Sequence, residues 1–212
     1  MMSLYNNLAD ILLRATGIHI GNRKLTNSMR SYVAKNENGI NILSMEKILN
    51  KINVAGKLIA RTIPNVVVIS NEPYAFQAIS KFSEIVGVQN IIARYIPGTF
   101  SNSILTNHIN PELVILTRPG YIDEKERTIG NYTALQDAIN ERIPIIALCD
   151  TDDDTSFIDL VIPCNNRSPK AIATTFYLLT RATLFHTNIP LNSWPRFQLT
   201  EFETTTEELV VR

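Results

Sequence analysis

Short apolar runs alternate with amphipathic stretches along most of the chain, a pattern that predicts alternating strands and helices. Continuous β-branched runs are typical of strands buried on both faces of a sheet, and such runs lie at 65–70, 113–117 and 144–149. Shorter runs predict weaker strands at 90–93 and 160–162. Apolar residues at helical spacing predict helices over 3–15, about 44–61, 73–86, 126–142 and 168–186.

Two further features complete the predicted architecture. Residues 32–35 and 40–43 flank a turn sequence, Asn36-Glu-Asn38-Gly39, which predicts a small hairpin. Strands joined by helices require right-handed crossovers and a parallel sheet covered on both faces. The predicted fold class is therefore α/β, a doubly wound parallel sheet with an N-terminal helix and hairpin and an irregular C-terminal extension. We expect one domain over 1–186 and an extension over 187–212 that docks on neighbouring proteins.

Composition narrows the class of protein. The chain has 212 residues, of which 45% are apolar and 19% charged, values typical of a folded globular protein. The longest apolar runs are far shorter than the roughly 20 residues of a membrane-spanning helix. Asp10 and Arg14 interrupt the first apolar stretch, so we expect no secretory signal. Two cysteines are too few for a disulfide scaffold, and we expect a reducing, cytosolic compartment.

The charges are unevenly distributed although the chain is neutral as a whole. Residues 1–61 carry nine lysines and arginines against three acidic residues, a net charge of +6, whereas residues 150–212 carry −4. A basic N-terminal third indicates either a localised anionic partner or simply uneven solvation of the surface.

Three polar loops are the candidate RNA-binding surface. Lysine and arginine neutralise phosphates, and asparagine and hydroxyl side chains hydrogen-bond sugar or phosphate oxygens. If the loops converge, they form one phosphate-facing patch. The candidate residues are Asn22, Arg23, Lys24, Asn27 and Arg30 in the first loop, Arg94, Thr99, Ser101 and Asn102 in the second, and Asn165, Asn166 and Arg167 in the third.

The C-terminal extension has scattered large apolar side chains but no periodicity of its own. Either these side chains fold back on the domain or they form a strip that docks on partner proteins, and we favour docking. The residues concerned are Trp194, Phe197, Leu199 and Phe202.

No dinucleotide, phosphate-loop or nucleophile-elbow motif follows any predicted strand. The one suggestive cluster is Asp150-Thr-Asp152-Asp153-Asp154, after a buried strand. Asp150 and Asp152 there would suit a magnesium-dependent phosphohydrolase, but we favour a solvated acidic turn that caps the next element. We expect no catalytic residue, no metal and no cofactor.

Four segments in the same order resemble a known family. They are Leu8–Gly21 (LADILLRATGIHIG), Arg94–Asn102 (RYIPGTFSN), Pro144–Asp152 (PIIALCDTD) and Ile158–Arg167 (IDLVIPCNNR). Together they resemble the universal small-subunit ribosomal protein family known in eukaryotes as SA, or laminin-receptor-precursor-like. The eukaryotic and archaeal branch is the closer match, and the similarity covers about residues 4–200.

This resemblance implies a flavodoxin-like fold and a structural, non-enzymatic role in the cytosolic small ribosomal subunit. The implied partners are ribosomal RNA and neighbouring ribosomal proteins, with a further role in assembly and maturation of the subunit. We expect no membrane partner and no homo-oligomer in the assembled state. One loop departs from the family pattern, because Arg118-Pro119-Gly120 stands where the family usually has Asp-Pro, and a charged stretch, Asp123–Arg127, follows.

Overall fold

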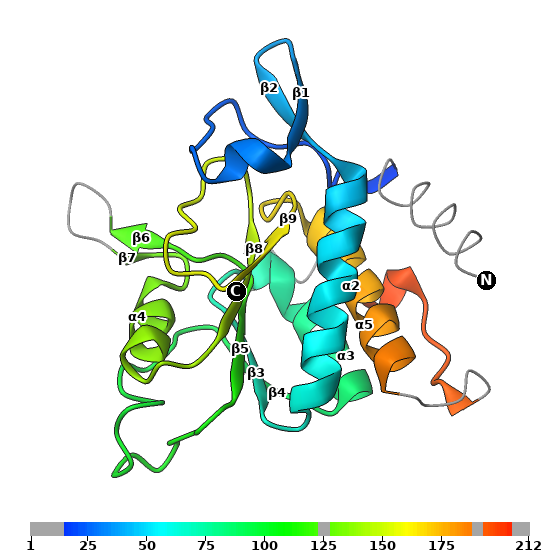
Figure 1. The fold of residues 1–212 in the computed structure, drawn as a ribbon. Helices are drawn as coiled ribbons and strands as arrows, with labels where there is room; N and C mark the ends of the chain where they lie inside the picture. The colour runs from blue at the N-terminus through cyan, green and yellow to red at the C-terminus, as the bar shows by residue number, and fades with distance from the viewer. Residues whose placement is uncertain (1–14, 123–127, 188–192, 205–212) are drawn as a thin grey trace.

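The computed structural model describes residues 15–122, 128–187 and 193–204. At its centre is a five-stranded parallel sheet in the order β4-β3-β5-β8-β9 (Figure 1). The order confirms the predicted doubly wound fold and is that of flavodoxin-like proteins. The strands are β3 (Val66–Ser70), β4 (Gln89–Ile92), β5 (Leu113–Leu116), β8 (Ile145–Cys149) and β9 (Leu160–Pro163).

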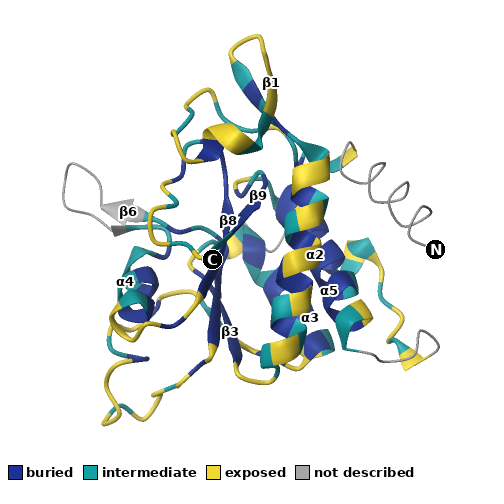
Figure 2. Ribbon diagram, viewed as in Figure 1, coloured by how far each residue is buried: buried dark blue, intermediate teal, exposed yellow. Residues whose placement is uncertain are grey.

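The three central strands form the middle of the hydrophobic core. Every residue of β3, β5 and β8 is buried (Figure 2), which explains why their sequences are continuous apolar runs rather than alternating patterns. The strands pair in register, with Val67 opposite Val114 and Leu116 opposite Ala147. The sequence predicted all five strands of this sheet to within one residue at most boundaries.

Helices cover both faces of the sheet, but unequally. The helices α2 (Met45–Thr62), α3 (Phe76–Val86) and α5 (Pro169–His186) lie on one face, and α4 (Tyr132–Asn140) lies on the other (Figure 1). Helix α5 packs against both α2 and α3. Almost all of its residues from 171 to 184 are buried, as its apolar sequence predicted. No helix in the described part of the chain is long and apolar enough to cross a membrane.

Helices α2 and α5 approach each other closely at Gly56. A Cβ atom added there would lie 2.7 Å from Ala182 Cβ and 2.8 Å from the Ala182 carbonyl carbon, closer than real atoms approach. The glycine therefore allows backbone-to-backbone contact and brings α2 down onto α5.

Smaller elements complete the molecule. The predicted hairpin is present as β1 (Val33–Glu37) and β2 (Ile40–Leu43), preceded by the 3₁₀ turn η1 (Met29–Tyr32). A second 3₁₀ turn, η2 (Pro73–Ala75), leads into α3, and a further one, η4 (Leu199–Glu201), lies near the C-terminus. The N-terminal helix predicted over 3–15 falls almost entirely outside the described residues.

The predicted helix over 126–142 is wrong in its first part. Residues of β7 (Thr128–Ile129) instead pair with β6 (Tyr121–Ile122) in a short antiparallel hairpin. Gly130 then adopts a left-handed conformation, with φ +67°, and Gly120 packs against the Ile129 carbonyl so closely that no side chain fits. This turn delays the start of α4 to Tyr132.

We expect Gly56→Ala to lower the free energy of unfolding by about 1–3 kcal/mol, the usual cost of overpacking. The sign is informative because alanine in a helix is otherwise favoured over glycine by about 1 kcal/mol. Chemical denaturation of the variant, with Lys57→Ala on the exposed side of α2 as control, measures the effect. Unchanged or increased stability of Gly56→Ala would contradict the close packing of α2 and α5.

Candidate nucleic-acid interface

The basic N-terminal segment 17–32 lies over the carboxyl end of the sheet, where the loops after β8 and β9 also emerge (Figure 1). Backbone hydrogen bonds hold it from two sides. The Gly21 amide donates to the Asn41 carbonyl of the hairpin at 2.9 Å, and the Thr26 amide donates to the Thr151 carbonyl at 2.9 Å. The amide of Asn165 donates to the Ile18 carbonyl at 2.8 Å. The segment is therefore an ordered part of the surface, although it has little regular secondary structure.

The acidic turn after β8 is buried, so the expectation of a solvated turn is wrong for its central residues. Asp150 and Asp153 are only 3% and 5% exposed. One oxygen of Asp153 accepts hydrogen bonds from the Asp150 amide at 2.9 Å and from the Asn166 side chain at 2.6 Å. Only Asp154 is exposed. The cluster closes the loop at the end of β8 and joins it to the loop at the end of β9.

Asp152 connects the first and third candidate loops directly. Its Oδ2 atom accepts a hydrogen bond from the Arg167 guanidinium at 2.6 Å and from the Asn22 side chain at 3.2 Å. Partial burial lowers the pKa of Arg167, but the hydrogen bond and charge of Asp152 outweigh this and raise it. Residues separated by more than a hundred positions in sequence thus share one carboxylate.

Beyond this contact, the first loop presents its charges to solvent. Arg23, Lys24, Asn27 and Arg30 are all exposed, while Asn22 is partly buried. The side chain of Arg167 is about one third exposed beside them. These residues form the candidate basic face: Asn22, Arg23, Lys24, Asn27, Arg30 and Arg167.

Two candidate residues are not on the surface. Asn166 is fully buried, and its side-chain amide donates to the Leu148 carbonyl at 3.0 Å as well as to Asp153. Thr99 is 5% exposed, and its hydroxyl donates to the Ile96 carbonyl at 2.7 Å. Both side chains hold a loop in place from inside the molecule. They are therefore not available for the RNA contact expected of them.

The second candidate loop is bound to helix α4. Within the described residues, no hydrogen bond or ion pair links it to the first or third loop. It is held instead against α4 by the buried Asp137, which accepts hydrogen bonds from the Tyr95 hydroxyl at 2.6 Å, the Phe100 amide at 3.0 Å and the Ser101 hydroxyl at 2.7 Å. Hydrogen bonds through Asp152 thus join the first and third loops, and convergence of the second loop with them stays a prediction.

The second loop carries few charged side chains. From Tyr95 to Pro111 the sequence contains no lysine, arginine, aspartate or glutamate. Arg94 and Asn102 are exposed, and the Asn102 side chain accepts a hydrogen bond from the Ile104 amide at 3.0 Å. Only Arg94 offers a cation at this loop.

Burial raises the pKa of the Asp137 carboxyl, but the donated hydrogen bonds from Tyr95, Ser101 and Phe100 outweigh it, and the net pKa lies below the usual value. Burial and the same hydrogen bond raise the pKa of Tyr95. Sequence analysis did not identify Asp137, because one carboxylate in an amphipathic helix resembles any solvent-facing residue.

Arg118, in the loop that departs from the family pattern, faces two acidic side chains. Its Nε lies 3.6 Å from Asp153 Oδ1, and its NH1 lies 4.0 Å from Glu72 Oε1. The charged stretch that follows, 123–127, lies outside the described residues. A cation at position 118 thus lies against the buried acidic turn, a pairing that spacing along the chain could not reveal.

The crevice where doubly wound folds usually bind ligands lies between β3 and β5, where the strand order reverses. Here it is filled by Asn131, which is 1% exposed. Its side-chain oxygen accepts a hydrogen bond from the Asn71 backbone amide at 3.0 Å, and its side-chain amide donates to the Arg118 carbonyl at 2.8 Å. The ends of the two strands are thereby tied together by one side chain.

The phosphohydrolase alternative finds no support. Protein donors occupy oxygens of Asp150 and Asp152, and no cluster of three or more histidine, cysteine or acidic side chains in the described residues is arranged to hold a metal. Burial, together with the charges of Asp152 and Asp153, raises the pKa of Asp150 to about 6.

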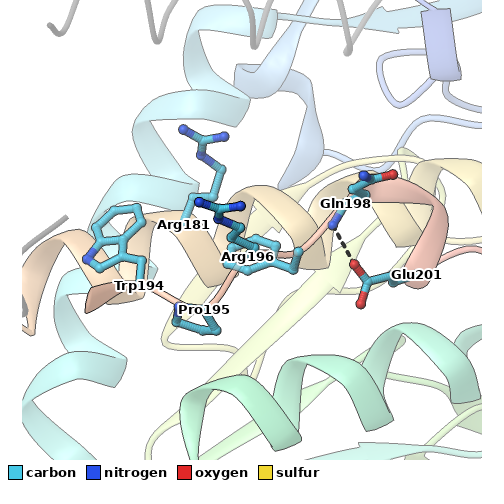
Figure 3. Close-up of a pocket in the computed structure, with 7 residues that line it drawn as sticks. Arg181, Trp194, Pro195, Arg196, Gln198 and Glu201 are labelled. Carbon is cyan, nitrogen blue, oxygen red and sulfur yellow. Dashed lines mark hydrogen bonds between the residues drawn. The ribbon is translucent and has the colours of Figure 1, made fainter. Parts of the chain in front are cut away.

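The described part of the C-terminal extension packs against α3 and α5. Phe202 is fully buried and packs edge-on against Tyr177 of α5 at 5.8 Å between ring centroids, so this residue folds back instead of forming part of an exposed strip. Phe197 packs against the same tyrosine at 5.6 Å and is partly buried. Trp194 lines a cavity beside α5 (Figure 3). Docking of partners by Trp194, Phe197 and Leu199 stays a prediction.

Asp150→Asn should be at least as stable as the wild type at pH 7. Because the pKa of Asp150 is raised from 3.8 to about 6 in the folded state, its ionisation above pH 6 disfavours folding by about 3 kcal/mol. The variant's advantage should shrink as the pH falls from 6 to 4 and the wild-type carboxyl becomes protonated. Urea denaturation across this range measures it. A variant that is less stable than the wild type at pH 7 would contradict the assignment.

Asp137→Ala should lower the free energy of unfolding by more than about 2 kcal/mol at pH 7, because it leaves the Tyr95 hydroxyl and Phe100 amide buried without an acceptor. The pKa of Asp137 is depressed, so the part of this contribution that depends on the charged carboxylate should persist down to about pH 4 and be lost as the pH falls further. Glu141→Ala, at the exposed end of α4, is the control. Similar stabilities of the two variants would show that the carboxylate does not anchor the loop.

Comparison with known proteins agrees with the four resembling segments. The family model described as ribosomal protein S2 matches residues 12–129 and 122–185. Relatives named "Small ribosomal subunit protein uS2" include that of Picrophilus torridus, 37% identical over 80% of this chain and 81% of the relative. That of Nitrosopumilus maritimus is 36% identical over 92% of each chain, and that of Nanoarchaeum equitans is 38% identical over 79% and 80%.

These matches extend across the sheet, the basic segment and the acidic turn, and they include the segments that form the carboxyl end of the sheet. The chain belongs to the ribosomal protein S2 family.

Proposed function

We propose that the chain is a non-catalytic constituent of the cytoplasmic small ribosomal subunit, where it binds ribosomal RNA and neighbouring ribosomal proteins and contributes to subunit assembly. Its relatives are named as proteins of the small ribosomal subunit, and the similarity covers most of both chains. In the assembled state we expect a single copy with no membrane partner.

The observation that carries the RNA contact is the ordered basic face. Hydrogen bonds to Asn41 and Thr151 fix the backbone of the basic segment on two sides, whereas the side chains of Arg23, Lys24 and Arg30 extend into solvent. Cations held on a fixed backbone meet phosphates without a large ordering cost on binding. Salt-sensitive affinity follows, because each neutralised phosphate releases counterions.

Charge reversal of Arg23 and Lys24 should weaken incorporation into small subunits. We expect the double variant Arg23→Glu, Lys24→Glu to shift a tagged protein from the small-subunit fractions of a sucrose gradient toward the top. In filter binding to small-subunit RNA, the slope of log affinity against log salt should fall by about 1–2, since two phosphate contacts are removed.

The matched control reverses two exposed cations elsewhere, Lys57→Glu and Arg61→Glu on α2, and leaves the net charge change identical. If both double variants lost affinity equally, the effect would come from total charge and not from the basic face. Normal sedimentation of Arg23→Glu, Lys24→Glu would refute the assignment of the face. Release of the wild-type protein from the small-subunit fractions by ribonuclease would be expected from an RNA-held component.

A further inference from the structure

The two edge strands of the parallel sheet, β4 and β9, differ in how they are protected from pairing with a further strand (Figure 1). An edge strand directs a row of unpaired amides and carbonyls away from the sheet. Natural proteins protect such edges with proline, with charged side chains or by covering them. An edge that has none of these features is therefore a candidate binding surface.

Strand β9 is protected on its outer side by a proline. The Cys164 amide donates to the Cys149 carbonyl at 3.0 Å, so Cys164 faces β8. Because alternate residues of a strand direct their backbone groups to opposite sides, Pro163 faces away from the sheet. Proline has no amide hydrogen to offer a further strand. Three of the four residues of β9 are also buried.

Strand β4 contains no proline, and every one of its residues is exposed or only partly buried. The Ala93 amide donates to the Ser70 carbonyl at 3.0 Å, so Ala93 faces β3. By the same alternation, the backbone groups of Asn90 and Ile92 face away from the sheet. Within the described residues, no turn, loop or side chain forms a hydrogen bond with the backbone of Asn90 or Ile92. The amides and carbonyls of these two residues are therefore open to a partner.

The surroundings of β4 are almost free of charge. Between Glu84 and Glu112 the only lysine, arginine, aspartate or glutamate is Arg94, although such residues make up 19% of the chain. A cavity of about 230 Å³ at the amino ends of β3 and β4 has no charged residue of these types in its lining either. The side chains of Gln89 and Asn110 contribute to this lining and form no hydrogen bond within the described residues. The edge therefore suits a partner without charged side chains.

We infer that β4 accepts an added strand from a neighbouring ribosomal protein, an extended segment of uncharged residues whose backbone pairs with Asn90 and Ile92. That the neighbour belongs to the small subunit rests on the proposed function. Strand addition of this kind draws its affinity from main-chain hydrogen bonds and its specificity from pockets for side chains. An RNA backbone is a poorer match, because phosphate oxygens accept hydrogen bonds but cannot donate to the two outward carbonyls.

Hydrogen exchange tests the pairing directly. Deuterium uptake at the amides of Asn90 and Ile92 is measured for the full-length protein, free in solution and within purified small subunits. We expect exchange at both amides to slow by at least about tenfold in the subunit. Unchanged exchange in protein that co-sediments with small subunits would overturn this inference and leave the proposed function intact. Failure to co-sediment would refute the proposed function, and this inference with it.

A photo-cross-linker identifies what covers the edge. Asn90→p-benzoylphenylalanine, irradiated within purified small subunits, should cross-link to an uncharged segment of another ribosomal protein that is at least as long as β4. The same substitution at Asn50, which is exposed on α2, should not reach that segment. Cross-links from position 90 to RNA, or to a second copy of this chain, would overturn the inference.

A matched pair of variants measures the contribution of the edge. Asn90→Lys places a charge on β4 that disfavours pairing, and it should lower the affinity for small subunits depleted of the protein by about tenfold. Asn50→Lys changes the net charge identically and should leave this affinity unchanged. Equal affinities of the two variants would also overturn the inference.

Discussion

Buried carboxylates that gather donors from distant segments hold the loops of this protein in place. Asp153 joins the end of β8 to the loop after β9 through Asn166, and Asp137 joins α4 to the loop after β4. A buried carboxylate without such donors would cost several kcal/mol, so it persists only where its acceptor sites are occupied. Each one therefore requires a particular loop conformation, and the sheet alone would not impose it.

The same constraint explains why the basic segment is ordered despite its polar sequence. Residues 17–32 bury few apolar side chains, chiefly Ile18 and Met29, and their backbone polar groups need partners. The hairpin and the acidic turn provide them, with Thr151 accepting from the Thr26 amide and its hydroxyl accepting from the Asn22 amide. Asp152 then draws Arg167 onto the segment. An acidic turn inside the molecule thus supports a basic surface outside it.

The sheet could be predicted from the sequence because a strand buried on both faces has a continuous run of apolar residues, such as Val66–Ser70. The roles of polar residues could not be predicted in this way, because asparagine and threonine occur both on surfaces that face a partner and inside the protein. Asn166, which donates to Asp153, and Thr99, which donates to the Ile96 carbonyl, are both buried. The start of α4 was predicted wrongly for a related reason. The close contact between Gly120 and the Ile129 carbonyl, which precedes the helix, joins residues that are not neighbours in the sequence.

Segregation of charge is what allows a neutral chain to engage partners of opposite character. At physiological ionic strength exposed charges are screened beyond about 8 Å, so a phosphate approaching Arg23 and Lys24 experiences the nearby cations of the basic face more than the acidic C-terminal third. The buried carboxylates add little to the outward field, because Asp153 faces Arg118 and Asp152 faces Arg167. A net charge of zero consequently says little about binding here, and the arrangement of the charges on the fold decides it.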